Sequence, residues 1–188
     1  MPVLHLLAGP NGAGKSTYAN RVLTPVTGLP FINADVIAKQ RWPGAEVEHA
    51  YEAARMAEGQ RRQLMSTRRS FITETVFSHV SKVALIADAV ALDYLVHLHV
   101  LLVPVDTTVQ RVAERVRRGE HDVPVHKIRE RFDRLWALVA DAIDLADEAE
   151  VLDNSSARNP FRVCATFESG RLVGDASWPT WVPEDLVR

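Results

Sequence analysis

A glycine-rich segment near the N-terminus constrains the fold of this 188-residue chain more than any other feature. Residues 9–16 read Gly-Pro-Asn-Gly-Ala-Gly-Lys-Ser and fit the pattern G-x-x-x-x-G-K-[ST] without a mismatch. The glycines let successive backbone N–H groups turn toward one anion, Lys15 adds a positive charge for the phosphates, and the Ser16 hydroxyl can ligate magnesium. An apolar run precedes the segment and a helical pattern follows it, as a phosphate-binding loop requires.

We therefore expect this loop to bind ATP or GTP together with Mg²⁺. The helix after the loop would aim the positive end of its dipole at the phosphates. The expected nucleotide contacts are Gly9, Pro10, Asn11, Gly12, Ala13, Gly14, Lys15, Ser16 and Thr17.

Apolar segments alternate with helical patterns along the chain, which is typical of a mostly parallel sheet covered by helices on both faces. The expected strands are residues 3–7, 29–33, 70–74, 94–103 and 150–152. The expected helices are residues 15–23, 46–69, 81–92, 106–118 and 124–149, with Ser81 as an N-cap. The prediction is an α/β fold of the P-loop NTPase class, with three layers and a five-stranded sheet in the kinase-like order 2-3-1-4-5.

The C-terminal region follows a different pattern. Residues 161–167 and 171–174 flank Ser169-Gly170 and predict a β-hairpin within a tail of about residues 160–188. Because no repeat or linker interrupts the chain, we expect one domain over residues 1–188.

Composition excludes several classes of protein. The net charge is −2, so no overall field draws the chain to nucleic acid. The single cysteine, Cys164, rules out a disulfide framework within the chain. The longest apolar run, near residues 94–105, is interrupted by histidines and a proline and is too short to cross a membrane. We expect a cytoplasmic protein with neither a nucleic-acid nor a membrane partner.

Absent motifs narrow the class further. The sequence has no guanine-reading Asn-Lys-x-Asp, no ABC-type signature and no apolar run ending in Asp-Glu, and it is short for a helicase. A kinase of a small-molecule substrate remains, and such an enzyme needs a base near the acceptor hydroxyl and cations over the transferring phosphoryl group.

Two acidic residues follow expected strands, where ligands sit in open parallel sheets. Asp35 comes just after the second strand and can accept the acceptor's proton, although it could also cap the next helix. Glu74 ends the third strand and could hold a magnesium-bound water or a substrate hydroxyl, or simply face solvent.

The cations are expected in a lid of about residues 111–134. Arg111, Arg115 and Arg118 recur at helical spacing along one face, and a Gly/Pro-containing loop follows them. The next helix repeats this arrangement with a face formed by Lys127, Arg131 and Arg134. The guanidinium group of arginine binds phosphate oxygens in a bidentate manner. The same pattern also fits a solvent-exposed helix face whose arginines form ion pairs with nearby acidic residues.

Taken in order, these motifs resemble the zeta toxin family of P-loop kinases. More narrowly, they resemble its stand-alone branch, often labelled predicted ABC-type ATPases. The resemblance spans roughly residues 3–156. It rests on residues 9–17, 31–35 (Phe-Ile-Asn-Ala-Asp), 74–75, 111–124 (ending in His-Asp-Val-Pro) and 153–155.

The resemblance implies transfer of a phosphoryl group from ATP or GTP to the 3′-hydroxyl of UDP-N-acetylglucosamine, and a possible antitoxin protein as a partner. Asp35 would be the general base and Lys15 the phosphate-binding lysine, while Glu74 and Thr75 would contact the sugar nucleotide. The remaining implied roles are Arg118 and Arg131 beside the transferring group, with Arg115 and Arg129 as alternatives, and Asn154 near the nucleotide base.

The chain also departs from that family. Glu120 stands where a second glycine is expected, no glycine separates Glu74 from Thr75, and the long C-terminal insertions are missing. Three alternatives therefore stay open. They are a phosphotransferase for another hydroxyl compound such as an antibiotic or nucleoside, a nucleotide-binding switch without acceptor phosphorylation, and a nucleic-acid 5′-hydroxyl kinase using the Arg-rich helix at residues 51–69.

Overall fold

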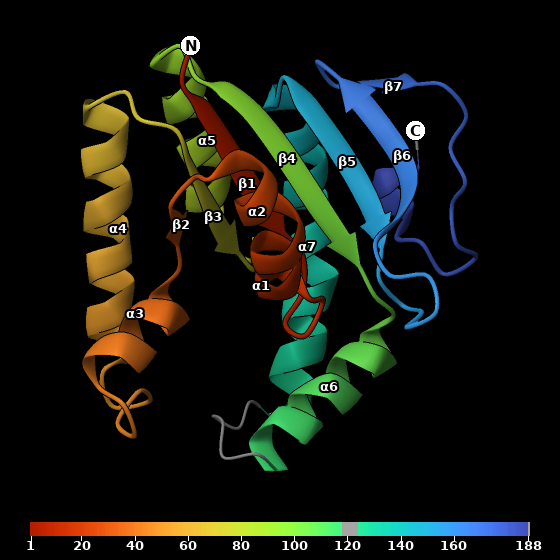
Figure 1. Ribbon diagram of the computed structural model, residues 1–188. Coiled ribbons are helices and arrows are strands. Elements are labelled where there is room, and N and C mark those ends of the chain that lie inside the picture. The colour runs from red at the N-terminus through yellow and green to blue at the C-terminus, as the bar shows by residue number, and fades with distance from the viewer. Residues whose placement is uncertain (118–123, 188) are drawn as a thin grey trace.

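The computed structural model, which describes residues 1–117 and 124–187, is built around one seven-stranded sheet (Figure 1). The strand order is β2-β3-β1-β4-β5-β6-β7. The parallel strands are β1 (Val3–Ala8), β2 (Phe31–Ile32), β3 (Phe71–Thr75), β4 (Leu95–Leu102) and β5 (Glu148–Asp153). The antiparallel strands are β6 (Arg162–Glu168) and β7 (Arg171–Val173).

The order of the five parallel strands is the one expected, 2-3-1-4-5. The expectation of a five-stranded sheet with a separate hairpin was wrong, because β6 pairs with β5 and makes the sheet a mixed one of seven strands. The sequence showed the hairpin but not its attachment, since pairing between β5 and β6 depends on tertiary packing rather than on local turn residues.

Helices cover both faces of the sheet. In Figure 1, α1 (Lys15–Tyr18), the π-helix η1 (Ala19–Leu23) and α2 (Thr24–Thr27) lie in front of β1, and α5 (Ser81–Ala91) and α7 (Val125–Leu145) lie behind it. The others are α3 (Ala34–Arg41), α4 (Ala50–Ser66), α6 (Val105–Arg117) and the 3₁₀-helix η2 (Glu184–Leu186). Among the described residues, no helix is both long and apolar enough to span a membrane.

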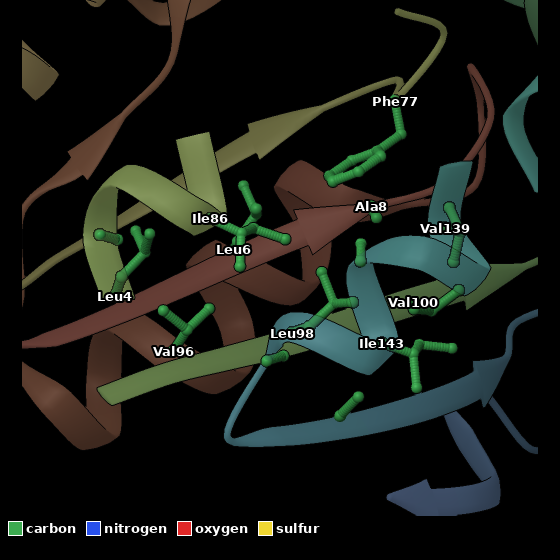
Figure 2. Packing of buried hydrophobic residues seen from close by; sticks show 14 of the residues in the cluster. Leu4, Leu6, Ala8, Phe77, Ile86, Val96, Leu98, Val100, Val139 and Ile143 are labelled. Carbon is green, nitrogen blue, oxygen red and sulfur yellow. The ribbon is translucent and has the colours of Figure 1, made fainter. Parts of the chain in front are cut away.

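The core divides into two clusters because successive strand residues point to opposite faces. Leu4 and Leu6 of β1 point to the face that α5 and α7 cover, where Ile86 lies beside Leu6 and Val139 lies farther along, near Val100 (Figure 2). Leu7 points to the opposite face. There it joins Ala13, Tyr18, Leu23, Leu101 and Leu152 beneath the first helices. The sheet is thus buried on both faces at β1, which fixes the loop that follows this strand.

Several local predictions need correction. The first helical region continues through Pro25, because a new turn begins there and proline is tolerated at the first helical positions; it ends at Gly28 with φ +66°. Ser81 is the first residue of α5 rather than its N-cap, since Val80 occupies that position. The second strand has only two residues because Asn33 already caps α3.

The C-terminal tail packs against the core of the same chain. Trp178, Trp181 and Val182 pack on the larger cluster, and Leu186 is buried within it. Arg162 of β6 also donates hydrogen bonds to the backbone carbonyl and hydroxyl of Ser177. The tail is therefore held on the body of the molecule, which the sequence alone left open.

Candidate functional site

The predicted phosphate-binding loop joins β1 to α1 at the carboxyl edge of the sheet. Its glycines meet steric demands that no other residue would satisfy. Gly9 has φ +144°, and a Cβ there would lie 2.5 Å from the Leu101 carbonyl oxygen. Gly14 has φ +94°, and a Cβ there would overlap the side-chain amide of Asn154. The loop is thus packed closely against the ends of the neighbouring elements.

Lys15 lies inside the loop that it is expected to serve. Its side chain is buried, and Nζ donates hydrogen bonds to the carbonyl oxygens of Gly9 and Pro10, each at 3.0 Å. A buried ammonium held by two carbonyls keeps its charge in place at low dielectric, where it attracts an anion strongly. This arrangement suits the binding of a phosphate above the loop.

Ser16 contacts Glu74 across the gap between α1 and β3. The Ser16 hydroxyl donates to Glu74 Oε2 at 2.8 Å. A hydroxyl and a carboxylate together offer the oxygen ligands that magnesium prefers, and this ion usually takes only one or two protein oxygens alongside phosphate oxygens. Among the described residues, no group of three or more acidic, histidine or cysteine side chains could hold a metal by itself. The pair Ser16 and Glu74 therefore fits magnesium that arrives with a nucleotide.

Two side chains from distant segments hold the outer carbonyls of the loop. Asn154, just after β5, donates from Nδ2 to the Ala13 carbonyl at 2.8 Å. Arg111 of α6 donates from Nη1 to the Gly12 carbonyl at 2.9 Å and from Nη2 to the Asn154 carbonyl at 3.0 Å. Because these carbonyls are bound on the outside, the loop's N–H groups are left for an anion.

This support was not apparent from the sequence. Asn154 was expected near the nucleotide base and Arg111 on a charged lid face, yet both side chains are engaged with the loop backbone. No local pattern reports a contact between residues 99 or 141 positions apart. The steric need for glycine at position 14 was visible in the motif, but its partner was not.

Asp35 lies in the first turn of α3, where the cap is another residue. Asn33 Oδ1 accepts hydrogen bonds from the backbone N–H groups of Asp35 at 2.6 Å and Val36 at 3.1 Å. Asn33 is buried, so the start of α3 is fixed. The alternative in which Asp35 caps the helix is therefore wrong, and its exposed carboxylate is left for another role.

One cleft brings most of the predicted site residues together. Its cavity volume is about 680 Å³. The loop contributes Asn11, Gly12, Gly14, Lys15, Ser16 and Thr17, and the wall formed by the start of α3 and the end of β3 contributes Asn33, Ala34, Asp35, Val36, Lys39, Glu74, Thr75 and Val76. Asn20, Arg111 and Glu114 complete the lining. Lys39, Asn20 and Glu114 were not among the predicted residues, because none belongs to a motif.

Of the other predicted loop contacts, Gly9, Pro10 and Ala13 act through their backbones. The carbonyls of Gly9 and Pro10 accept from Lys15, and that of Ala13 accepts from Asn154. At the end of β3, the Thr75 hydroxyl accepts a hydrogen bond from the Phe77 backbone N–H at 3.3 Å. This bond fixes the orientation of a hydroxyl at the cleft wall.

The lid arginines differ in their surroundings. Arg131 does not line the main cleft; together with Pro10, Asn11 and Val76 it lines a narrow gap beside the loop that has no room for a water molecule. Arg129 pairs with Asp106 at 2.7 Å and Arg134 with Glu130 at 3.0 Å, both on the surface, as the solvated reading of these faces predicts. Arg118 lies outside the described residues.

For Arg115, which belongs to α6, only the backbone is described. Of the expected lid at residues 111–134, the structure describes the end of α6 and the start of α7. Residues 118–123 lie outside the described residues.

Three histidines lie on the sheet face beneath the first helix. His5 Nδ1 and His99 Nε2 are 3.1 Å apart, and the Tyr18 ring lies over His99 with 5.5 Å between centroids. His97 and His99 each face a glutamate of β5, at 3.3 and 3.4 Å. Burial, with smaller effects from the charges of His99 and His97, lowers the pKa of His5 from 6.5 to about 4. His5 is therefore neutral near pH 7.

A family of proteins described as an AAA domain matches residues 4–138, which include the loop, the cleft and most of α7. The chain belongs to this AAA-domain family. Among curated proteins, none matches the sequence.

Solved structures share the fold of this AAA-domain chain at low sequence identity. The complex of AvrRxo1-ORF1 and AvrRxo1-ORF2 matches with a TM-score of 0.72 at 17% identity, covering 92% of this chain and 60% of that one. The PezAT chromosomal toxin–antitoxin system of Streptococcus pneumoniae matches at 0.60 and 16%, covering 81% and 68%. Shikimate kinase from Acinetobacter baumannii, in complex with shikimate, matches at 0.56 and 18%, covering 84% and 86%.

These likenesses show a P-loop, kinase-like α/β fold. The AAA-domain chain spans only 60% of the length of the AvrRxo1 chain that it matches.

Proposed function

We propose that this chain is a kinase that transfers the γ-phosphoryl group of magnesium-bound ATP or GTP to a hydroxyl group of a small acceptor. The observation that carries the proposal is that Lys15, the Ser16–Glu74 pair and Asp35 line one cleft although they come from separate segments. A switch that only binds nucleotide would have no need of an exposed carboxylate in the same cleft as its phosphate-binding loop. The shared fold of shikimate kinase supports the same class of activity.

In the proposed reaction, the nucleotide phosphates lie on the N–H groups of residues 9–16, and Lys15 neutralises charge on the transferring group. Asp35 accepts the proton of the acceptor hydroxyl. A bond forms between the acceptor oxygen and the γ-phosphorus, the bond to the bridging oxygen breaks, and ADP or GDP leaves. Most of the catalysis would come from positioning and charge stabilisation.

Magnesium, when bound, supplies positive charge to the β- and γ-phosphate oxygens. Ser16 would be its protein ligand. Glu74 accepts the Ser16 hydroxyl at 2.8 Å, so it would orient that ligand or hold a metal-bound water. This role for Glu74 stands beside the earlier expectation that it contacts the acceptor together with Thr75.

For the acceptor, our first choice is the 3′-hydroxyl of UDP-N-acetylglucosamine, with Asp35, Glu74 and Thr75 as contacts and Arg131 and Arg118 as the cations beside the transferring group. This choice follows from the resemblance of the sequence motifs to the zeta toxin family. The shared fold of the PezAT toxin–antitoxin system supports only a protein antitoxin as a partner. A different hydroxyl compound is the second choice, because the cavity of about 680 Å³ is lined mainly by polar side chains that suit any small polyol. ATP is favoured as donor, since the AvrRxo1 complex, with a TM-score of 0.71, is also known with ATP.

The test is phosphoryl transfer from radiolabelled ATP to a panel containing UDP-N-acetylglucosamine, shikimate and an antibiotic with free hydroxyls. We expect Asp35→Asn to lower kcat by about 10²–10⁴-fold while leaving the Kd of ATP unchanged, because the amide cannot accept the proton. Asp88→Asn is the matched control, since Asp88 is exposed on α5 and does not line the cleft. Equal, acceptor-independent ATP hydrolysis by the wild type and Asp35→Asn would favour the switch instead.

A further inference from the structure

Lys39 lines the acceptor end of the cleft and has no place in the proposed chemistry so far. It lies on α3 four residues after Asp35, so the two side chains emerge from the same helical face about 6 Å apart at Cβ. Both are exposed to solvent. The proposed base and a cation are thus adjacent along one wall of the cleft.

The other described cations of the cleft are already engaged by the protein. Lys15 donates to two loop carbonyls, and Arg111 donates to the carbonyls of Gly12 and Asn154. Lys39 makes no hydrogen bond or ion pair within residues 1–117 and 124–187. Although Asp35 is one turn away, the two do not form an ion pair there.

The acid in the field of Lys39 is Glu46, in the segment between α3 and α4. Backbone N–H groups of Gly44 and Glu46 are the main cause that lowers the pKa of this carboxyl, and Lys39 adds a smaller effect. Because backbone donors already serve the Glu46 carboxylate, the Lys39 ammonium is left available to a ligand.

We propose that Lys39 binds an acidic group of the acceptor, a phosphate or a carboxylate, so that the substrate is an anionic hydroxyl compound. This inference rests on the proposed function, because it assigns to Asp35 the hydroxyl of the same molecule. The acceptor would span one helical turn of α3, with its hydroxyl on Asp35 and its acidic group on Lys39. A lysine suits this task because its flexible stem and point charge reach a phosphate or a carboxylate equally well.

This pairing would also set the orientation of the acceptor. A charge-assisted hydrogen bond at one end leaves the hydroxyl end as the part that faces Asp35 and the γ-phosphate. Neutral compounds of the same shape would enter the cleft without that constraint. Lys39 would therefore act on acceptor binding and selectivity rather than on proton transfer.

The experiment compares matched acceptors that differ only in the acidic group. N-acetylglucosamine is paired with N-acetylglucosamine 1-phosphate, and shikimate with its methyl ester, with UDP-N-acetylglucosamine as an added member. Transfer from ATP is measured for the wild type, Lys39→Ala, Lys39→Arg and Arg41→Ala. Arg41 is the control because it is an exposed cation of the same helix that does not line the cleft.

We expect the wild type to prefer an acidic member of a pair, and Lys39→Ala to raise the KM for that member by about 10- to 100-fold. The KM for ATP and the activity toward neutral members should stay unchanged, Lys39→Arg should retain most of the preference, and Arg41→Ala should behave as wild type. The phosphate and carboxylate pairs show which acidic group is recognised. Equal use of both members of each pair, or an equal loss for both in Lys39→Ala, would overturn the inference.

A direct measurement of acceptor binding tests the role of Lys39 separately from the proposed kinase activity. Calorimetry with the same pairs, in the presence of a non-hydrolysable ATP analogue and Mg²⁺, needs no turnover. If an acidic member binds through Lys39 but is never phosphorylated, the kinase proposal fails and the inference stands. If no acidic member binds, or if binding ignores Lys39→Ala, the inference fails whatever the activity.

Discussion

The two ends of the cleft are built in different ways. At the nucleotide end, the loop is enclosed by its neighbours, with Lys15 buried and the outer carbonyls held by Arg111 and Asn154. At the acceptor end, Asp35 and Lys39 stand exposed on the short helix α3, whose start is capped by Asn33. The loop at one end is held by side chains from other elements, whereas the two charged side chains at the other end project into solvent.

The difference indicates where the binding of each partner is determined. A triphosphate is the same in every reaction, so its end can be rigid and its residues can be tied to the sheet. An acceptor differs from one kinase to another, and exposed side chains on α3 can change without disturbing the core. We therefore expect substitutions at the nucleotide end to alter ATP binding and folding, and those at the acceptor end to alter turnover or acceptor selectivity while leaving ATP binding and folding unchanged.

Gly14→Ala should have the largest effect at the nucleotide end. The new methyl group would overlap the Asn154 amide, and alanine is strained at φ +94°. We expect the Kd of ATP to rise about 100-fold, or stability to fall by about 2 kcal/mol, as measured by calorimetry and urea unfolding. Gly28→Ala is the matched control, because φ is also positive there but a Cβ would meet nothing within 4 Å. Normal ATP binding by Gly14→Ala would show that the loop is less constrained than its contacts indicate.

Arg111→Ala should have a smaller effect of the same kind. Without the guanidinium, the carbonyls of Gly12 and Asn154 lose their donors and the loop loses its link to α6. We expect the Kd of ATP to rise about tenfold with acceptor preference unchanged. A double-mutant cycle with Asn154→Ala should give a coupling of about 0.5 kcal/mol or more, because both residues hold the same loop. Asn159→Ala, at an exposed position in the segment after β5, is the control. Additive effects of Arg111→Ala and Asn154→Ala would show that the two residues act on the loop independently.

Lowering the pH should reduce the stability of the sheet beneath the first helix, next to the nucleotide end. His5 has a folded pKa of about 4, below its ordinary 6.5, so the unfolded chain takes up this proton first as the pH falls. Its contribution to stability is complete above pH 6.5 and is lost progressively down to about pH 4. We expect a loss of about 1–2 kcal/mol from this group, after allowing for solvent around a partly exposed ring.

Urea unfolding of the wild type and His5→Asn between pH 7.5 and 4 measures that contribution. The free energy of unfolding of His5→Asn should fall less as the pH is lowered. His126→Asn, at an exposed position of α7, should follow the wild type. Parallel curves for the wild type and His5→Asn would mean that His5 titrates normally and that the sheet beneath the first helix is open to water.

The nucleotide end was also the more predictable from sequence. The pattern of residues 9–16 is a local one, so it located the loop, Lys15 and Ser16. The alternation of strands and helices indicated a mostly parallel sheet, and the P-loop kinase class supplied the order of the parallel strands. Position at a strand end placed Asp35 and Glu74 correctly in one cleft, because the carboxyl ends of parallel strands share an edge.

What could not be predicted depends on contacts between distant segments. The attachment of β6 to β5, the packing of the tail and the links from Arg111 and Asn154 to the loop all join residues far apart in sequence. Lys39 was missed for another reason: it belongs to no motif, and only the structure shows that α3 brings it to the cleft wall one turn after Asp35.

The most direct test of the account is a crystal structure with a non-hydrolysable ATP analogue and Mg²⁺. The account predicts the phosphates on the N–H groups of residues 9–16, the metal at Ser16, and the γ-phosphorus about 5–6.5 Å from the Asp35 carboxylate, a gap that fits one acceptor hydroxyl. Phosphates bound away from this loop, or an Asp35 carboxylate turned away from the γ-phosphate, would contradict it.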